Sequence, residues 1–161
     1  MGRLVAFVLL LSLFAFPVWG KDKEPYVWER VNEVDLTQQE IITYAHVYLA
    51  EKFVSSKDFI QLNDPALGKL VGTVILRNKD ARLLHAFHGI RGRLIIDAKD
   101  GRYRIQMTNI VGTDSDGQPH SWGQIEGANN YRIQPMAESV LDDFSDELTS
   151  FLASAKANED W

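Results

Sequence analysis

A predicted β-hairpin within residues 91–111 constrains the fold of this chain more than any other feature. Residues 102–111 alternate polar and apolar side chains, which is the period-two pattern of a strand with one buried face. Asp100 and Gly101 precede this stretch, and an Asp-Gly pair accepts the positive φ angles that a tight hairpin turn needs. Residues 91–97 supply the strand before the turn. The chain must therefore build at least part of an antiparallel sheet.

Three other stretches have the composition of strands. They are rich in β-branched residues or alternate apolar with polar residues, and they lie at 26–34, 59–62 and 69–77. Residues 79–89 fit either a hairpin loop or an irregular extension of a strand. Residues 112–134 are rich in Gly, Asp, Asn, Ser and Gln, and we expect them to form a loop.

Two amphipathic helices complete the expected set of elements. Thr37 and Glu40 form a capping box ahead of apolar residues at helical spacing, which predicts a helix over about 37–54. Pro135 suits the first turn of a second helix that runs towards the end of the chain. The expected fold is α+β: a curled antiparallel sheet of four to five strands, with both helices on one face. The order is one strand, one helix, up to four strands and a final helix, in a single domain.

The first twenty residues have the order of a secretory signal peptide. Arg3 gives a short positive region, residues 4–16 form an apolar run, and Val18 and Gly20 fit the positions before a cleavage site. We expect the mature chain to be residues 21–161, periplasmic or secreted, without stable membrane insertion after cleavage. An uncleaved anchor is the alternative, although the apolar run is shorter than the roughly 20 residues of a spanning helix.

The composition of the mature part limits the classes of partner. Without Arg3 it has 16 Lys and Arg against 22 Asp and Glu, a net charge of −6. This balance disfavours nucleic acid and anionic membrane surfaces as partners. The sequence has no cysteine, which excludes disulfides, thiolate metal sites and a cysteine nucleophile. An exported domain of this kind must be held together by packing alone.

Three stretches resemble a known protein family. They are 44–53 with its continuation at 57–61, 68–72, and 97–104 with its Asp-Gly-Arg-Tyr-Arg run. Together they resemble a family of exported bacterial domains of unknown function with a TATA-box-binding-protein-like fold. The resemblance implies that fold over roughly residues 27–112. It implies no activity, so no residue inherits a catalytic role, and the name of a fold does not imply DNA binding.

Few residues have the spacing of a catalytic or metal site. His85 and His88 are three apart, which would suit a shared metal on a helix, but a strand places such residues on opposite faces. His46 and His120 stand alone. Paired carboxylates in the last helix are expected on its solvated face. We therefore predict no catalytic residue, no metal and no cofactor, with a hydrolase-like envelope enzyme of unrecognised site as the alternative.

Charge is segregated along the chain. Residues 77–104 have a net charge of +5, whereas residues 112–161 have a net charge of −8. Within the basic stretch four arginines recur with period two in the two hairpin strands, which places them on one sheet face. They are Arg91, Arg93, Arg102 and Arg104.

Two interpretations of this basic face stay open. It can be a solubilising face whose charges guard the sheet against aggregation. Alternatively it docks a protein of unknown identity or an anionic ligand, since like charges side by side repel and arginine is suited to carboxylate or phosphate. The acidic last helix of a second copy could serve as the partner, which would make the protein self-associate. The predicted function is an exported, non-enzymatic binding or docking domain.

Overall fold

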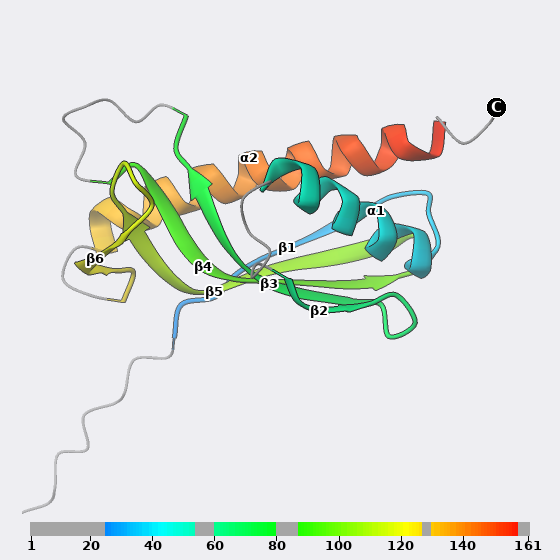
Figure 1. Ribbon diagram of the computed structural model, residues 1–161, viewed down its shortest axis with the longest axis horizontal. Helices are drawn as coiled ribbons and strands as arrows, with labels where there is room; N and C mark the ends of the chain where they lie inside the picture. The colour runs from blue at the N-terminus through cyan, green and yellow to red at the C-terminus, as the bar shows by residue number, and fades with distance from the viewer. Residues whose placement is uncertain (1–24, 54–59, 80–86, 127–129, 158–161) are drawn as a thin grey trace, which may run out of the picture.

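The protein is a two-layer α+β structure in which both helices cover the same face of an antiparallel sheet (Figure 1). The computed structural model describes residues 25–53, 60–79, 87–126 and 130–157. The elements are β1 (Trp28–Glu33), α1 (Gln38–Lys52), β2 (Ile60–Asp64), β3 (Lys69–Arg77), β4 (Gly89–Lys99), β5 (Arg102–Thr113), β6 (Pro119–Gln124) and α2 (Asn130–Ala157). The predicted signal peptide lies outside the described residues.

The sheet is built around the predicted hairpin. The strand order is β1-β5-β4-β3-β2, and β6 pairs with β5 as well. Lys99 of β4 faces Arg102 of β5 across the turn, where Gly101 has a φ of +80°. β1 is the first strand in the chain but joins the far side of β5, with Glu33 opposite Arg102. The hairpin prediction is confirmed, and the long-range pairing of β1 extends the sheet beyond it.

The capping box begins α1 as predicted. The Thr37 amide donates to Glu40 Oε2 at 2.6 Å, and the Glu40 amide donates to Thr37 Oγ1 at 3.4 Å. These bonds satisfy two backbone N–H groups that the start of a helix otherwise leaves unpaired. The Gln38 amide also donates to Asp100 Oδ1 at 2.7 Å, which ties the start of the helix to the β4–β5 turn.

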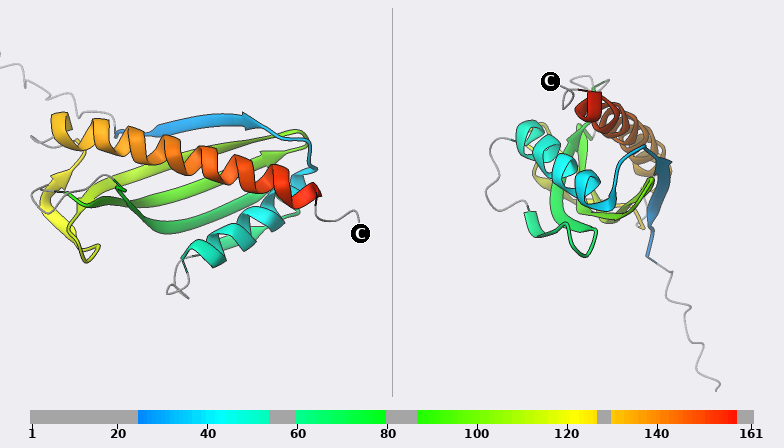
Figure 2. Two further views of the ribbon diagram at one scale, coloured as in Figure 1. Left: turned by 90° about the horizontal axis from the view of Figure 1, so that it is seen from above. Right: turned by 90° about the vertical axis from the view of Figure 1, so that its right-hand side faces the viewer.

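The core lies between the sheet and the helices. The sheet face towards the helices presents alternate residues of each strand, such as Leu94 and Ile96 of β4 and Ile105 and Met107 of β5, all fully buried. α2 runs along the length of this face, and α1 lies beside its C-terminal half (Figure 2). The Tyr48 ring of α1 lies 5.2 Å from that of Phe151 and 6.1 Å from that of Phe144, as measured between centroids.

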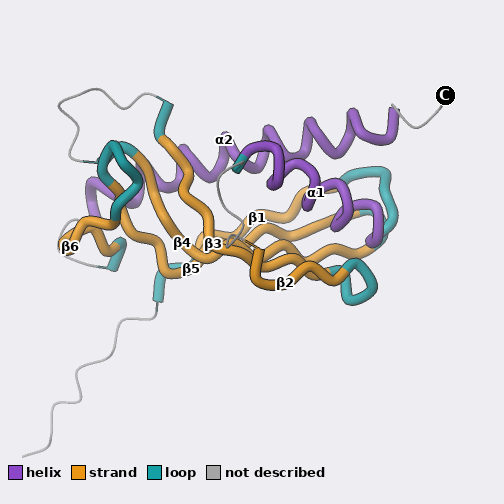
Figure 3. The backbone as a smooth tube through the Cα atoms, viewed as in Figure 1, coloured by secondary structure: helices purple, strands orange, loops and turns teal. Residues whose placement is uncertain are grey.

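The structure corrects two features of the expected fold. The described residues contain six strands rather than four to five, because residues 119–124 of the expected loop form β6 against β5 (Figure 3). α2 begins at Asn130, so Pro135 lies inside the helix and not in its first turn. Pro135 removes only the bond to the carbonyl of Tyr131, which lies near the exposed start of the helix. No helix among the described residues is long and apolar enough to cross a membrane.

Candidate functional site

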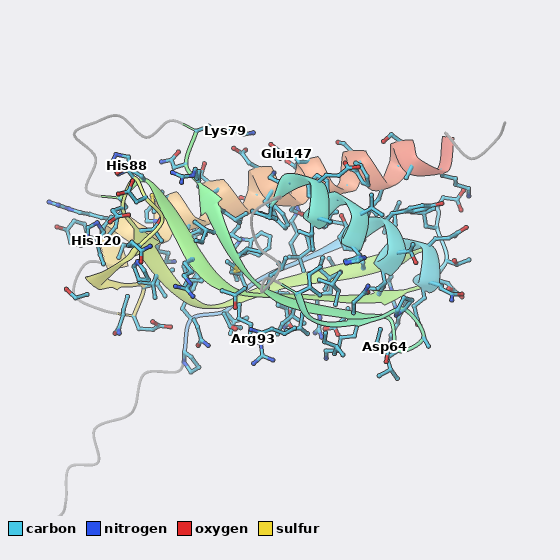
Figure 4. All side chains as sticks on the ribbon, viewed as in Figure 1. Asp64, Lys79, His88, Arg93, His120 and Glu147 are labelled. Carbon is cyan, nitrogen blue, oxygen red and sulfur yellow. The ribbon has the colours of Figure 1, made fainter. Side chains whose placement is uncertain are left out.

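The sheet face that points away from the helices is an open surface, which we call the outer face. It presents the residues that alternate with the core residues: in β4, Arg91 and Arg93 are exposed while Leu94 and Ile96 are buried. In β5, Arg102 and Arg104 alternate with the buried Tyr103 and Ile105. All four predicted arginines therefore lie on the outer face, as the period-two pattern indicated. Figure 4 shows Arg93 projecting from the sheet on the side opposite the helices.

The register separates the four arginines into two pairs. Arg102 faces Lys99, and Arg104 faces Asp97, near the hairpin turn. Arg93 faces Thr108, and Arg91 faces Val111, further along the same two strands. No arginine of one pair stands opposite an arginine of the other. The four arginines therefore share one face of the sheet, but no two of them stand opposite each other on neighbouring strands.

Arg91 and Arg93 line an open hollow of about 420 Å³. β4 runs through its middle, and Gln61 of β2 and Pro119 of β6 lie at its two sides. The complete lining is Gln61, Thr73, Arg91, Gly92, Arg93, Asn109, Val111 and Pro119. It contains no acidic side chain. Among the described residues, neither arginine side chain has a hydrogen bond or an ion pair.

A β-bulge shapes the sheet at this hollow. The register of β4 against β5 shifts between Arg91 and Arg93, so that Gly92 stands opposite an extra residue. Asn109 of β5 takes the left-handed conformation there, with a φ of +54°. A Cβ atom on Gly92 would lie 2.8 Å from the Thr108 carbonyl oxygen and 2.9 Å from Met107 Cε. The close approach of the two strands therefore requires glycine between the two arginines.

Arg104 belongs to a row of alternating charges. Asp64, Lys69, Asp97 and Arg104 stand opposite one another on four neighbouring strands. Arg104 Nη2 lies 2.9 Å from Asp97 Oδ2, Lys69 Nζ lies 3.2 Å from Asp97 Oδ1, and Arg104 Nη1 lies 3.7 Å from Glu29. Partial burial raises the pKa of Asp97, but the bonds from Arg104 and Lys69 outweigh it and lower that pKa below its usual value. Arg104 therefore has partners within its own chain.

A second, smaller hollow lies by the hairpin turn. Its volume is about 290 Å³, and it is lined by Val31, Asp97, Ala98, Lys99, Arg102, Tyr103 and Arg104. Here Lys99 and Arg102 face each other as like charges. However, Asp97 is part of the lining and Glu33 stands opposite Arg102 on β1. Acidic and basic side chains therefore mix at this hollow, in contrast to the hollow at Arg91 and Arg93.

The acidic side chains of α2 are engaged inside the chain. Glu147 forms ion pairs with Lys52 and Lys79, and Tyr48 donates to it at 3.1 Å; Figure 4 shows Lys79 and Glu147 on the helix side of the molecule. The bonds from the two lysines lower the pKa of Glu147 to about 2. Arg30 of β1 pairs with two further carboxylates of α2, Asp142 at 3.6 Å and Asp146 at 2.8 Å. Asp142, Asp143 and Asp146 are exposed, as expected for a solvated helix face, and Glu147 is partly buried.

The histidines do not converge on a described metal site. His85, which lies three residues before His88, is outside the described residues. The Nδ1 atom of His88 is buried and lacks a hydrogen-bond partner. The ring of His120 lies 5.4 Å from that of Phe87. The described residues contain no group of three or more His, Asp or Glu side chains that could hold a metal ion.

The sequence contains one further signal, the position of Asp97, which indicates that Arg104 has an ion-pair partner. Counting back from a two-residue turn at Asp100 and Gly101 places Asp97 opposite Arg104, as the structure has it. That register predicts an ion pair, which removes Arg104 from the group of unpaired arginines. The bulge at Asn109 shifts the register beyond Arg93, and the left-handed position is held by an asparagine, not by Gly112, the glycine of β5.

Comparisons with known proteins agree with the fold. A family model described as a domain of unknown function (DUF4468) with TBP-like fold matches residues 28–112. A DUF4468 family protein from Bacteroides ovatus superposes with a TM-score of 0.50 at 17% identity, covering 81% of this chain and 85% of that one. A TBP-like protein from Parabacteroides distasonis superposes with a TM-score of 0.50 at 15% identity, covering 82% and 92%. No curated protein matches the chain.

Proposed function

Since the chain belongs to the DUF4468 family of domains of unknown function, we propose its function from the outer face: an exported, non-enzymatic domain that binds an anionic ligand at Arg91 and Arg93. The observation that carries the proposal is the pairing state of the arginines. Arg104 is neutralised by Asp97 and Glu29. Arg91 and Arg93 have no such partner among the described residues, and they line one hollow.

The neighbours of Arg91 and Arg93 leave their charge uncompensated. Arg93 stands between Thr73 and Thr108, and Arg91 stands between Ile75 and Val111. None of these four neighbours is charged. Two guanidinium groups two residues apart on one strand face repel each other, and an anion between them relieves that repulsion. The end of the outer face near the β4–β5 turn has no comparable excess of positive charge, because acidic and basic side chains alternate across the strands there.

The lining chemistry favours binding over catalysis. General acid–base catalysis needs a side chain whose pKa lies near the working pH. The hollow is lined by arginine, amide, hydroxyl and apolar side chains, and an arginine keeps its proton at any physiological pH. The described lining therefore supplies positive charge and hydrogen-bond donors but no group that exchanges a proton near neutrality.

The ion pairs of α2 favour an external ligand over a second copy of the chain. Self-association through the acidic last helix would need its carboxylates to be available. Asp142, Asp146 and Glu147 are instead paired with Arg30, Lys52 and Lys79 of the same chain. Docking against a second copy would have to break these pairs or rely on the remaining acids, such as Asp143. Binding of a ligand from outside the chain does not require these ion pairs to break.

Export is supported by the order of charge, apolar run and small residues within the first twenty residues. The absence of cysteine fits an exported domain stabilised by packing, as the fully buried core between sheet and helices provides. We place the working domain in the periplasm or outside the cell.

Citrate tests the proposed function, because it is a small carboxylate anion that carries several negative charges at neutral pH. In ¹H–¹⁵N NMR titrations of residues 21–161, citrate should shift the amides of Gly92 and Asn109. The double variant Arg91→Gln/Arg93→Gln should weaken citrate binding by about tenfold or more, with strong salt dependence. The matched control is Arg102→Gln, which removes an exposed arginine from the other hollow. If the double variant binds citrate like the unchanged protein, the outer face is only a solubilising surface.

A further inference from the structure

Resting on the proposed function, we infer that the Arg91–Arg93 hollow is selective for a phosphate monoester, whose dianion is held between the two guanidinium groups. The anion could in principle be a carboxylate, since arginine binds both groups through two parallel hydrogen bonds. Two properties of the hollow distinguish between them, its charge and its number of donors, and the lack of a competing acid leaves both arginines available.

The charge of the hollow matches a dianion. Arg91 and Arg93 are both exposed on the same face of β4, and their Cα atoms are separated by two strand residues, about 7 Å. The long side chains can converge from this spacing on one group placed between them. A phosphate monoester carries close to two negative charges at pH 7, whereas a carboxylate or a sulfate ester carries one. A single monoanion would leave one positive charge of the pair uncompensated.

The hydrogen-bonding groups of the hollow are mainly donors. Gln61 Nε2 donates to Thr73 Oγ1 at 3.3 Å, which leaves the hydroxyl proton of Thr73 free to point into the hollow. Asn109 adds an amide at the bulge. A guanidinium group has five N–H donors. Two guanidinium groups and a hydroxyl therefore offer more donors than the two oxygens of a carboxylate can accept. The three terminal oxygens of a phosphate monoester accept more of these bonds.

No described acid competes for the two arginines. The closest outer-face carboxylate along β4 is Asp97, four residues from Arg93, and it is bound by Lys69 and Arg104. On β3, Arg77 Nη1 donates to the Ser115 carbonyl oxygen at 2.5 Å. The apolar lining residues Val111 and Pro119 lie on the β5–β6 side of the hollow, where they can contact the organic part of an ester.

Three probes with the same apolar body separate these possibilities: phenyl phosphate, phenyl sulfate and benzoate. NMR titrations at pH 7.5 should give an affinity for phenyl phosphate about tenfold higher than for the two monoanions. Arg91→Gln and Arg93→Gln should each reduce that affinity by about tenfold, since both guanidinium groups hold the phosphate. Arg102→Gln should leave it unchanged.

The pH dependence gives an independent readout. Because the second pKa of a phosphate ester is near 6, its affinity should fall about tenfold between pH 7.5 and pH 5, as the dianion is lost. Phenyl sulfate stays a monoanion over this range, so any change in its affinity reports the protein's own groups near the hollow, such as His120, which follows Pro119 on β6.

Each outcome separates this inference from the proposed function. Equal affinities for phenyl phosphate and benzoate, both lost in the arginine variants, would overturn phosphate selectivity and leave anion binding in place. A loss in only one arginine variant would overturn the placement of one dianion between two guanidinium groups. If none of the three probes nor citrate binds, both the selectivity and the proposed function fail.

Discussion

Asp97 and Arg104 face each other on neighbouring strands, with Arg104 Nη2 2.9 Å from Asp97 Oδ2. Arg104 is thereby engaged within its own chain, whereas Arg91, Arg93 and Arg102 have no ion-pair partner among the described residues. Arg104→Gln should therefore lower the free energy of unfolding by about 0.2–1 kcal/mol, the usual range for an exposed ion pair. Arg93→Gln should have no such cost. Urea unfolding of both variants is the measurement, and an equal or larger loss for Arg93→Gln would contradict the assignment.

Glu147 should make stability depend on pH in the acid range. Its pKa falls from 4.5 in the unfolded chain to about 2 in the folded protein, because Lys52 and Lys79 donate to it. The folded state therefore binds fewer protons, so the contribution of Glu147 is fully present above about pH 4.5 and is lost as the pH falls towards 2. Since the carboxylate is partly exposed, we expect a contribution of about 1 kcal/mol or less.

Glu147→Gln tests this dependence. Urea midpoints measured from pH 5 to pH 2 should fall less steeply for the variant than for the unchanged protein. Asp143→Asn is the matched control, because Asp143 is exposed and lies on the same helix. If the unchanged protein and Glu147→Gln lose stability in parallel over this range, the ion pairs with Lys52 and Lys79 do not form in solution.

Phe144 should be more important for stability than Phe53. Phe144 is only 2% exposed, whereas Phe53 is partly buried at the end of α1. Phe144→Ala should cost about 3–5 kcal/mol, as is typical for a buried phenylalanine. Phe53→Ala should cost clearly less. Chemical denaturation that ranks the two variants in the reverse order would show that the helix faces are assigned wrongly.

Gly92→Ala tests whether the bulge shapes the hollow. The added Cβ would lie within 3 Å of the Thr108 carbonyl oxygen and Met107 Cε, so β4 and β5 must move apart. We expect a loss of about 1–3 kcal/mol, as for other overpacked sites. Citrate binding should weaken even though both arginines are kept. Unchanged thermal stability together with unchanged citrate binding would mean that the strands tolerate a side chain at this position.

The export prediction is tested by the mass of the mature protein. Expression of the full chain in a bacterial host should give a product that begins at or near Lys21, because Val18 and Gly20 suit the cleavage site. Intact-mass measurement of the exported fraction decides the start of the chain. Retention of residues 1–20 in a membrane fraction would instead support an uncleaved anchor.

The sequence by itself determined the features that depend on neighbours in the chain. The capping box of Thr37 and Glu40 begins α1, and the Asp100–Gly101 turn joins β4 to β5, because these bonds form within a few residues. The alternation of β5 likewise placed Arg102 and Arg104 on the face opposite Tyr103 and Ile105. A strand has a period of two whatever it pairs with, so the face of each arginine was predictable.

Only the tertiary structure decided which charges are neighbours. Period two gives the face of a side chain but not the residue beside it, which depends on strand order, register and bulges. The register puts Asp97 beside Arg104, and the bulge at Asn109 brings Val111 beside Arg91. The packing of α1 against α2 likewise brings Lys52 to Glu147, 95 residues away. Such contacts between distant segments determine which arginines keep a free charge, and so where the candidate site lies.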